Sequence, residues 1–122
     1  MNSKSQKKKI SKIKIRARRV RSKMVGTAAK PRASVFRSHR HISVQLINDT
    51  AHKTLLSASD LELQKNQKKI TGRGKAKAVG LIIAKKSLDK KINTVIFDRG
   101  AYKYHGQVKE LAEGMREGGL KL

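Results

Sequence analysis

The alternation of apolar and polar residues in the first half of the chain predicts three β-strands. Residues 33–37 form a short β-prone run, and residues 41–47 alternate strictly, with one face made of Ile42, Val44 and Leu46. A period of two is typical of a half-buried strand, because successive side chains point to opposite faces of a sheet. Turn-forming residues follow, and residues 53–58 are a third β-prone run. The pattern therefore predicts a three-stranded antiparallel meander.

A helical period replaces the alternation in the second half. Residues 60–75 are polar and interrupted by two glycines, which predicts a loop. Ala76, Val79, Gly80 and Ile83 then recur at the three- and four-residue spacing of a helix face. We expect Gly80 to be tolerated because the helix packs very close to the sheet.

Two further elements complete the predicted fold. Residues 94–97 are a continuous apolar run, typical of a strand covered on both faces. A second amphipathic helix runs from Val108 to Met115 and ends at Gly118-Gly119. A strand–helix–strand step gives a right-handed crossover, so the fourth strand should run parallel to a neighbour. The order β-β-β-α-β-α predicts an α/β fold of α+β type, a mixed four-stranded sheet with packed helices.

A basic segment precedes this fold. Its apolar residues fall on one face of a helix: Ile10, Ile13, Ala17, Val20 and Met24. Like charges at helical spacings repel one another in the free protein, and binding to a polyanion relieves that repulsion. We therefore divide the chain into a basic arm, residues 1–30, disordered or helical on binding, and a single α/β domain, residues 31–122.

The charge distribution points to a polyanionic partner. The chain carries 31 Lys and Arg against 8 Asp and Glu, and no acidic residue precedes Asp49. A core cannot bury such a run of unpaired charges, whereas a nucleic acid neutralises it and releases counterions. A solubilising tail is the alternative, although such tails seldom exclude acidic residues so completely. The apolar face of the arm also lacks the Trp, Phe and Leu that favour a membrane surface.

Other features of the composition narrow the functional class. The chain has no Cys, and therefore no disulfide, no thiolate nucleophile and no Cys-based zinc site. Its longest apolar run, residues 78–84, is far shorter than the ~20 residues of a spanning helix. The N-terminus is charged but has no apolar h-region of a secretory signal. We expect a soluble, cytoplasmic protein.

The sequence offers no convincing catalytic pattern. Residues 72–75 (GRGK) resemble a phosphate-binding loop in composition but match neither the Walker nor the dinucleotide spacing. Only Asp49 and Asp98 lie at predicted strand ends, too few carboxylates for a two-metal nuclease. His39 and His41 are two residues apart and could both bind a metal ion, but surface contacts with RNA explain them more simply. We predict no enzyme, no cofactor and no metal.

Two segments carry side chains suited to RNA. The turn after residue 36 is rich in cations, and residues 98–106 place Tyr102 and Tyr104 beside Arg, Lys and His. A tyrosine next to basic residues can stack on a base while its neighbours bind phosphates. Either tyrosine alone could equally cap the core. With the arm and the GRGK segment, the candidate RNA-binding residues are Lys12, Lys14, Arg16, Arg18, Arg19, Arg21, Lys23, Arg32, Arg37, Ser38, His39, Arg40, His41, Arg73, Lys75, Arg99, Tyr102, Lys103, Tyr104 and His105.

Two blocks of sequence carry a family resemblance. The first is KPRASVFRS at residues 30–38, followed by His41-Ile42 and Gln45; the second is FDRGAYKYHGQVK at residues 97–109, followed by LA at 111–112 and REGGL at 116–120. From about Lys14 to Leu122 the chain resembles the bacterial large-subunit ribosomal protein family numbered eighteen. The resemblance implies a non-catalytic structural protein that binds 5S ribosomal RNA and helps attach it to 23S ribosomal RNA in the central protuberance. It also implies contacts with neighbouring ribosomal proteins, including the one numbered five, and a relative of the ribonuclease H-like sheet.

The chain departs from the family pattern at several positions. The family usually has Asn at His39, Tyr at Ser43 and Gly at Ala101, and the change at Ser43 puts aromatic stacking from that strand in question. It also usually has Gly at Lys91 and Ala at Gly114. If residue 91 is left-handed, a non-Gly residue there costs about 1 kcal/mol.

A histone-like or architectural DNA-binding protein is the rival function. Phosphate contacts alone do not distinguish RNA from DNA. Architectural proteins often insert apolar wedges between base pairs, and the sequence pattern shows no exposed wedge.

Overall fold

The secondary structure follows the predicted order in a computed structural model that describes residues 24–63 and 72–122. The elements are β1 (Arg32–Arg37), β2 (Ile42–Asn48), β3 (Lys53–Ser59), the short 3-10 helix η1 (Asp60–Glu62), α2 (Gly72–Asp89), β4 (Ile96–Asp98) and α3 (Gln107–Glu117). The predicted meander and both predicted helices of the domain are confirmed. The helix expected in the arm lies outside the described residues.

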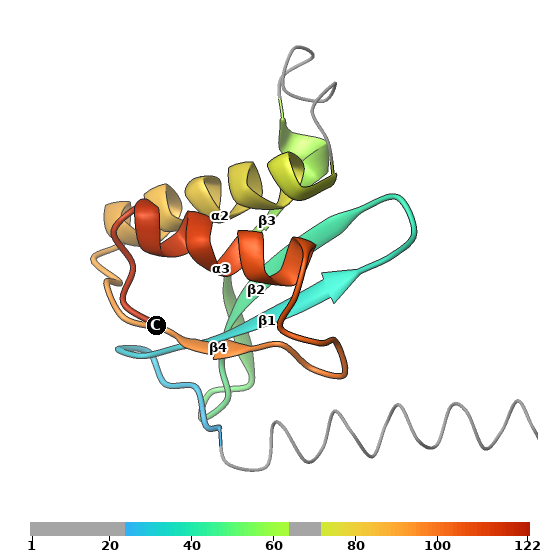
Figure 1. The fold of residues 1–122 in the computed structure, drawn as a ribbon. Helices are drawn as coiled ribbons and strands as arrows, with labels where there is room; N and C mark the ends of the chain where they lie inside the picture. The colour runs from blue at the N-terminus through green and yellow to red at the C-terminus, as the bar shows by residue number, and fades with distance from the viewer. Residues whose placement is uncertain (1–23, 64–71) are drawn as a thin grey trace, which may run out of the picture.

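The strands form one mixed sheet in the order β3-β2-β1-β4 (Figure 1). β2 pairs antiparallel with both β1 and β3, and β4 pairs parallel with β1. The chain therefore crosses over from β3 through α2 to reach the far side of β1. This confirms the mixed α/β sheet and the parallel fourth strand, while the relation to the ribonuclease H-like sheet stays a prediction.

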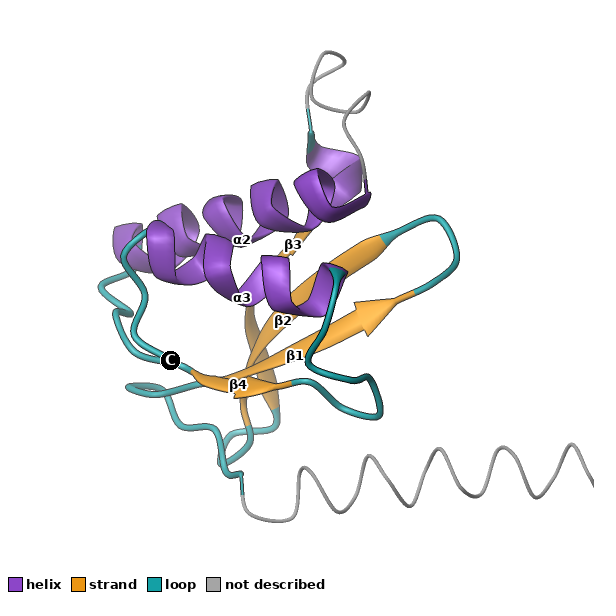
Figure 2. Cartoon of the chain, viewed as in Figure 1, coloured by secondary structure: helices purple, strands orange, loops and turns teal. Residues whose placement is uncertain are grey.

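Both long helices lie on the same face of the sheet (Figure 2). The hydrophobic core forms between this face and the two helices. Alternate residues of β1 and β2, such as Val35 and Val44, turn toward the helices and are buried. They meet residues of both helices: Val79, Ile83, Leu111 and Met115. Ser34 and Gln45 pair across β1 and β2 on the alternate positions, and both are only partly buried. The period of two thus separates an apolar face under the helices from a polar face without them.

Two glycines set the distance between the helices. A Cβ atom at Gly80 would meet the backbone nitrogen of Met115 at 2.8 Å, and one at Gly114 would meet the carbonyl carbon of Lys77 at 3.0 Å. Gly80 therefore allows close packing against α3 and not, as expected, against the sheet. Gly114 belongs to the same contact, so the close approach offsets its helix-propensity cost of up to ~1 kcal/mol relative to Ala.

The loop predicted over residues 60–75 is wrong at both ends. Asp60 begins η1, and α2 begins at Gly72, four residues before the predicted periodic stretch. The glycines lower the intrinsic helix propensity of this first turn and so conceal it in the sequence. A Cβ atom at Gly72 would displace the flexible side-chain amide of Gln107, which lies against this first turn.

The expectation that the fourth strand is covered on both faces is also wrong. β4 lies at the edge of the sheet, and both Ile96 and Phe97 are only partly buried. The fully buried residue of this run is Val95, just before the strand. Its N–H donates to the Lys121 carbonyl at 2.9 Å, so the C-terminal segment covers this end of the run.

Lys91 adopts a left-handed conformation, as the family's usual glycine at this position predicted. Its φ angle is 61°, and the neighbouring Ile92 N–H donates to the Ser87 carbonyl at 2.8 Å to end α2. A lysine here costs about 1 kcal/mol relative to glycine.

A buried ion cluster holds the start of β1. Arg32, which is 6% exposed, donates from Nη1 to Asp98 at 2.7 Å and from Nε and Nη2 to Asp49, each at 3.1 Å. Hydrogen bonding to Asp49 raises the pKa of Arg32 above its ordinary value, against the opposing effect of burial. Asp49 also accepts from the Gly26 N–H at 2.7 Å. The cluster therefore fixes the point at which the arm joins the sheet.

Candidate nucleic-acid interface

The turn between β1 and β2 presents exposed cations. Residues 37–41 are all exposed. The Ser38 N–H donates to the His41 carbonyl at 2.9 Å, and the His41 N–H donates to Ser38 Oγ at 3.1 Å, which closes the turn. Within the described residues no carboxylate forms an ion pair with Arg37 or Arg40. Both guanidinium groups are therefore available to an anionic partner.

Asp60 anchors the returning side of this turn. Its carboxylate is nearly buried, with Oδ2 at 2.9 Å from Nδ1 of His41 and Oδ1 accepting from the Ile42 N–H at 3.3 Å. The anchoring role of Asp60 was not predicted, because residues 60–75 were expected to form a loop. The available signal was the capping box of Ser59 and Glu62, which the structure forms around Asp60.

Hydrogen bonds also order the loop between β4 and α3. Asp98 Oδ1 accepts from the Gly100 N–H at 2.8 Å, and Arg99 donates from Nη1 to the Tyr102 carbonyl. The Tyr102 hydroxyl donates to the Arg37 carbonyl at 2.9 Å and accepts from the Arg37 N–H at 3.0 Å. Tyr102 thus joins the loop to the end of β1, and the turn and the loop form one surface.

The two tyrosines have different surroundings. Tyr102 packs against the hydrophobic core, so the core-capping alternative describes it. Tyr104 is 42% exposed and lies edge-to-face with Phe97, the ring centroids 6.0 Å apart. Its hydroxyl accepts from Arg116 at 3.0 Å, and this hydrogen bond raises the pKa of Arg116. Tyr104 therefore offers ring surface, whereas Tyr102 positions the turn.

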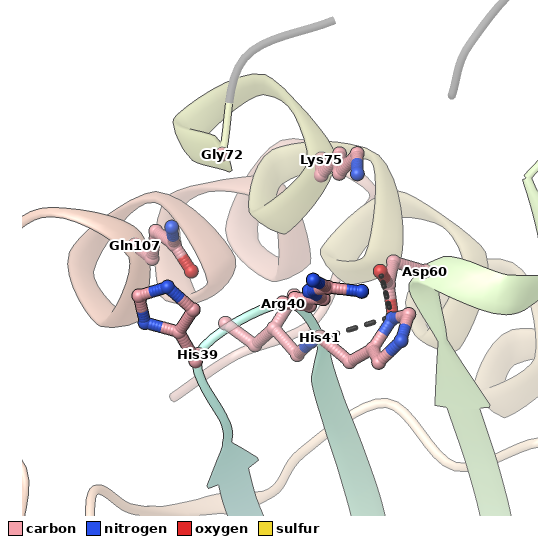
Figure 3. Close-up of a pocket in the computed structure, with 8 residues that line it drawn as sticks. His39, Arg40, His41, Asp60, Gly72, Lys75 and Gln107 are labelled. Atoms are coloured by element: carbon pink, nitrogen blue, oxygen red, sulfur yellow. Dashed lines mark hydrogen bonds and ion pairs between the residues drawn. The ribbon is translucent and has the colours of Figure 1, made fainter. Parts of the chain in front are cut away.

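The N-termini of both long helices meet above the turn (Figure 3). Gly72, the first residue of α2, adjoins the side chain of Gln107, the first residue of α3. The first turn of α2 contains no acidic residue, whereas that of α3 contains Glu110, and Gly106 gives α3 no side-chain cap. The dipole of each helix makes its N-terminal end partly positive.

Two adjoining hollows lie between these helix ends and the turn. The first has a volume of about 430 Å³ and is lined by His39, Arg40, His41, Ile42, Asp60, Gly72, Lys75 and Gln107. The second has a volume of about 510 Å³ and is lined by Arg37, Gly72, Arg73, His105, Gly106 and Gln107. Asp60 is the one carboxylate among these lining residues, and His41 already pairs with it. The arrangement favours anionic groups such as phosphates.

The structure brings many of the candidate residues of the domain together around these hollows: Arg37, His39, Arg40, His41, Arg73, Lys75 and His105. Ser38 closes the turn, and Arg99, Lys103 and Tyr104 belong to the adjoining loop. Arg32 lies at the opposite end of β1 with its side chain buried in the ion cluster, so we remove it from the candidate set. The candidates from Lys12 to Lys23 lie outside the described residues.

Gln107 was not among the candidates predicted from the sequence, and Gly72 entered only as part of the GRGK segment. Gln107 follows a glycine at the start of a predicted helix, a signal that could have placed it at a helix N-terminus. Nothing in the sequence alone brings the starts of two helices together, because that contact depends on how they cross.

Other kinds of site find no support in the described part of the chain. No group of three His, Asp or Glu side chains is placed there to hold a metal ion. Asp98, one of the two carboxylates considered for a nuclease, binds Arg32 and the Gly100 N–H. Neither described helix combines the length and apolar character required to cross a bilayer.

Comparison with known proteins identifies the family. A family model described as ribosomal L18 of archaea, bacteria, mitochondria and chloroplasts matches residues 6–122. The chain belongs to this family. It is 53% identical to the large ribosomal subunit protein uL18 of Thermotoga petrophila over 109 residues, which cover 88% of this chain and 89% of the relative. It is 47% identical to the uL18 protein of Pseudothermotoga lettingae over 121 residues, 98% of each chain.

Family membership confirms the resemblance drawn from the two sequence blocks. The chain is a structural, non-enzymatic constituent of the large ribosomal subunit, and its setting is the ribosome in the cytoplasm. Its partners are accordingly ribosomal RNA and ribosomal proteins.

Proposed function

We propose that this ribosomal L18 family member binds 5S ribosomal RNA and helps attach it to 23S ribosomal RNA in the central protuberance. The observation that supports this most strongly is the convergence of unpaired cations, two helix N-termini and an exposed tyrosine on one surface. Arg37 and Arg40 supply charge, the starts of α2 and α3 supply the positive ends of two helix dipoles, and Tyr104 supplies a ring. RNA recognition uses this combination, because phosphates and unstacked bases are presented together.

The rigidity of this surface suits selective binding. Asp60 and Tyr102 each tie the turn to a different part of the fold. Side chains held in this way can discriminate between shapes of RNA, whereas the cations of the basic arm contribute phosphate contacts that do not depend on the RNA sequence. We assign selectivity to the turn and the adjoining loop, and general affinity to the arm.

The proposal includes two further specific partners of the chain. The resemblance implies 23S ribosomal RNA and the ribosomal protein numbered five as neighbours of the chain. The basic character of the whole chain, with a formal net charge of +23, supports contact with more than one RNA segment.

One argument against the rival DNA-binding function no longer holds, and family membership supplies another. The absence of an exposed apolar wedge, expected from the sequence pattern, is wrong, because Phe36 is 49% and Leu61 64% exposed. Membership of a ribosomal family now favours RNA over DNA.

Competition binding tests the proposal directly. Labelled 5S RNA bound to the full chain is challenged with duplex DNA and with an unrelated structured RNA at physiological salt. We expect both competitors to displace 5S RNA only in large excess. Equal displacement by duplex DNA would favour the architectural DNA-binding function instead.

Removal of the arm tests whether the arm supplies general affinity while the turn and the loop supply selectivity. A chain lacking residues 1–24 keeps Gly26 and therefore the anchor on Asp49. We expect it to bind 5S and unrelated RNA more weakly and to the same extent, with a shallower dependence of log K on log salt. A full-length salt slope in the truncated chain would show that the arm makes no phosphate contacts.

A further inference from the structure

Phe36 stands apart among the four aromatic residues of the chain. Phe97 and Tyr104 pack against each other, and the Tyr102 hydroxyl bonds to the backbone of Arg37. Phe36 is 49% exposed and pairs with no other ring in the described parts of the chain. A single exposed apolar side chain is ordinary at a protein surface, so the surroundings of the ring decide whether it binds a partner.

The sheet register places Phe36 on the face that carries no helix. Its neighbour Val35 and the paired Val44 are buried beneath the helices, so Phe36 and its cross-strand partner Ser43 face the other way. Ser43 in turn pairs with Ser59 on β3. The Phe36 ring therefore lies beside the small side chains of Ser43 and Ser59, which leave space next to it.

A hollow of about 220 Å³ occupies this space. It is lined by Phe36, Arg37, Ser38, His41, Ser43 and Tyr102. None of these residues carries a negative charge, whereas Arg37 carries a positive one. Hydrogen bonds fix two sides of the hollow, since Tyr102 binds the backbone of Arg37 and Ser38 binds His41.

The chemistry of this hollow fits a nucleobase better than an apolar side chain. A flat ring offers a stacking surface, the Ser43 hydroxyl can bond to a base edge, and Arg37 can hold the adjoining phosphate. An aliphatic partner would cover the ring but would form no hydrogen bond with the Ser43 hydroxyl or the Arg37 guanidinium. The basic charge of the chain favours the same occupant.

We propose that Phe36 is a base-stacking residue that receives an unpaired base of the bound RNA. This rests on the proposed 5S RNA function and extends it to a site on the helix-free face of the sheet, beside the turn.

Substitutions at Phe36 in the full-length chain, tested with 5S RNA at fixed salt, separate stacking from apolar contact. Phe36→Leu keeps an apolar side chain but removes the ring, and Phe36→Tyr keeps the ring. We expect Phe36→Leu to weaken binding by about fivefold or more, the range typical of a lost base stack. Phe36→Tyr should bind nearly as the parent does, and the salt slope should be unchanged in both because no charge is altered.

Leu61 provides the matched control. It is 64% exposed and lies on η1, outside the hollow, so Leu61→Ala should leave 5S binding unchanged. Base-specific chemical probing of the RNA supplies a second measurement. One unpaired base should be protected by the parent chain and by Phe36→Tyr, and should remain reactive with Phe36→Leu.

The outcomes distinguish this inference from the proposed function. If the parent chain prefers 5S RNA over duplex DNA but Phe36→Leu binds as the parent does, the stacking site is wrong and the proposed function stands. If Phe36→Leu instead weakens duplex DNA binding more than 5S binding, Phe36 is a DNA wedge and the inference is overturned. If the parent chain shows no preference for 5S RNA, the proposed function itself fails.

Discussion

The two ends of strand β1 carry the same kind of residue in opposite environments. Arg32, at its start, is buried and bonded to Asp49 and Asp98. Arg37, at its end, is exposed and joins Arg40 on a turn where no described carboxylate pairs with either. Arg32 therefore stabilises the fold, whereas Arg37 is available to bind an anionic partner. The difference lies in the partners that the fold supplies and not in the arginines themselves.

The comparison also shows why charge alone does not identify an interface. The partners of Arg32 are 17 and 66 positions away in the sequence, so no local pattern reveals them. Of the few carboxylates in this chain, two are used at the start of β1 and a third, Asp60, holds the turn. The acidic residues therefore decide which cations remain available to RNA.

Substitution of Arg32 should have the largest effect. Arg32→Met leaves Asp98 buried without its cation, and breaking a buried pair in this way costs about 3–5 kcal/mol. We expect urea unfolding to show a loss of this size. The salt dependence of RNA binding should be unchanged under conditions where the variant is folded.

Arg32→Lys tests the same site more gently. It keeps the charge, but a single ammonium group cannot reproduce the guanidinium bonds to both carboxylates, so stability should fall between the parent and Arg32→Met. If Arg32→Met were as stable as the parent and bound RNA more weakly, Arg32 would belong to the interface and the comparison would fail.

The double substitution of Arg37 and Arg40 by Ala should show the opposite behaviour. Both side chains are exposed, so the free energy of unfolding should change by less than about 0.5 kcal/mol. The loss of two phosphate contacts should lower the slope of log K against log salt by about 1–2, and the preference for 5S RNA should fall.

A matched control removes two lysines from the other end of the sheet. Lys53 and Lys90 are exposed and line a separate hollow. Their double substitution by Ala removes the same charge and should reduce 5S selectivity less. Equal effects of the two double variants would mean that only total charge matters.

Tyr102→Phe should have a smaller effect on 5S selectivity than the double arginine variant, together with a modest effect on stability. It removes the hydroxyl that bonds to the Arg37 backbone, a loss typical of about 0.5–1.5 kcal/mol. We expect a modest loss of stability in thermal unfolding together with weaker discrimination for 5S RNA, because the turn is less firmly held. Tyr104→Phe, which loses only the bond from Arg116, serves as the comparison. Selectivity that falls in Tyr104→Phe and not in Tyr102→Phe would contradict this assignment.

The smallest effect should come from Glu62, which joins η1 to α2. Burial raises the pKa of Glu62, but the hydrogen bonds from Lys86 and the Ser59 backbone outweigh it and lower that pKa below its usual 4.5. A lowered folded-state pKa stabilises the protein above pH 4.5, and this contribution is lost as the pH falls further. The pair is about 40% exposed, so its contribution is below about 1 kcal/mol.

Glu62→Gln should therefore reduce stability slightly at pH 7 and flatten the acid loss below pH 4.5, as measured by urea unfolding across pH. Glu113→Gln, at an exposed pair with Arg116, is the control and should leave the acid profile close to that of the parent. An acid profile of Glu62→Gln identical to that of the parent would show that the pair does not stabilise the fold.

The sequence predicted the elements of the fold better than their surroundings. The alternation through Ile42, Val44 and Leu46 located β2 because burial on one face imposes a period of two. The same local pattern could not show that Gly80 meets α3, since that contact depends on how two distant helices cross.

The candidate site shows the same division. Exposed residues of the turn were predictable from their polarity, and the structure gathers them around two hollows. The burial of Arg32, the anchoring role of Asp60 and the meeting of the two helix N-termini were not predictable, because each depends on residues far apart in sequence. Tertiary partners decide whether a charged side chain supports the fold or faces a ligand.

Chemical modification of arginine side chains, read by mass spectrometry with and without 5S RNA, tests the contrast between the two ends of β1 most directly. In the free protein Arg37 and Arg40 should react readily, and 5S RNA should protect both, while Arg32 should stay unreactive in both states. Arg37 and Arg40 that remain equally reactive in the complex, or an Arg32 that reacts freely and becomes protected, would contradict the account.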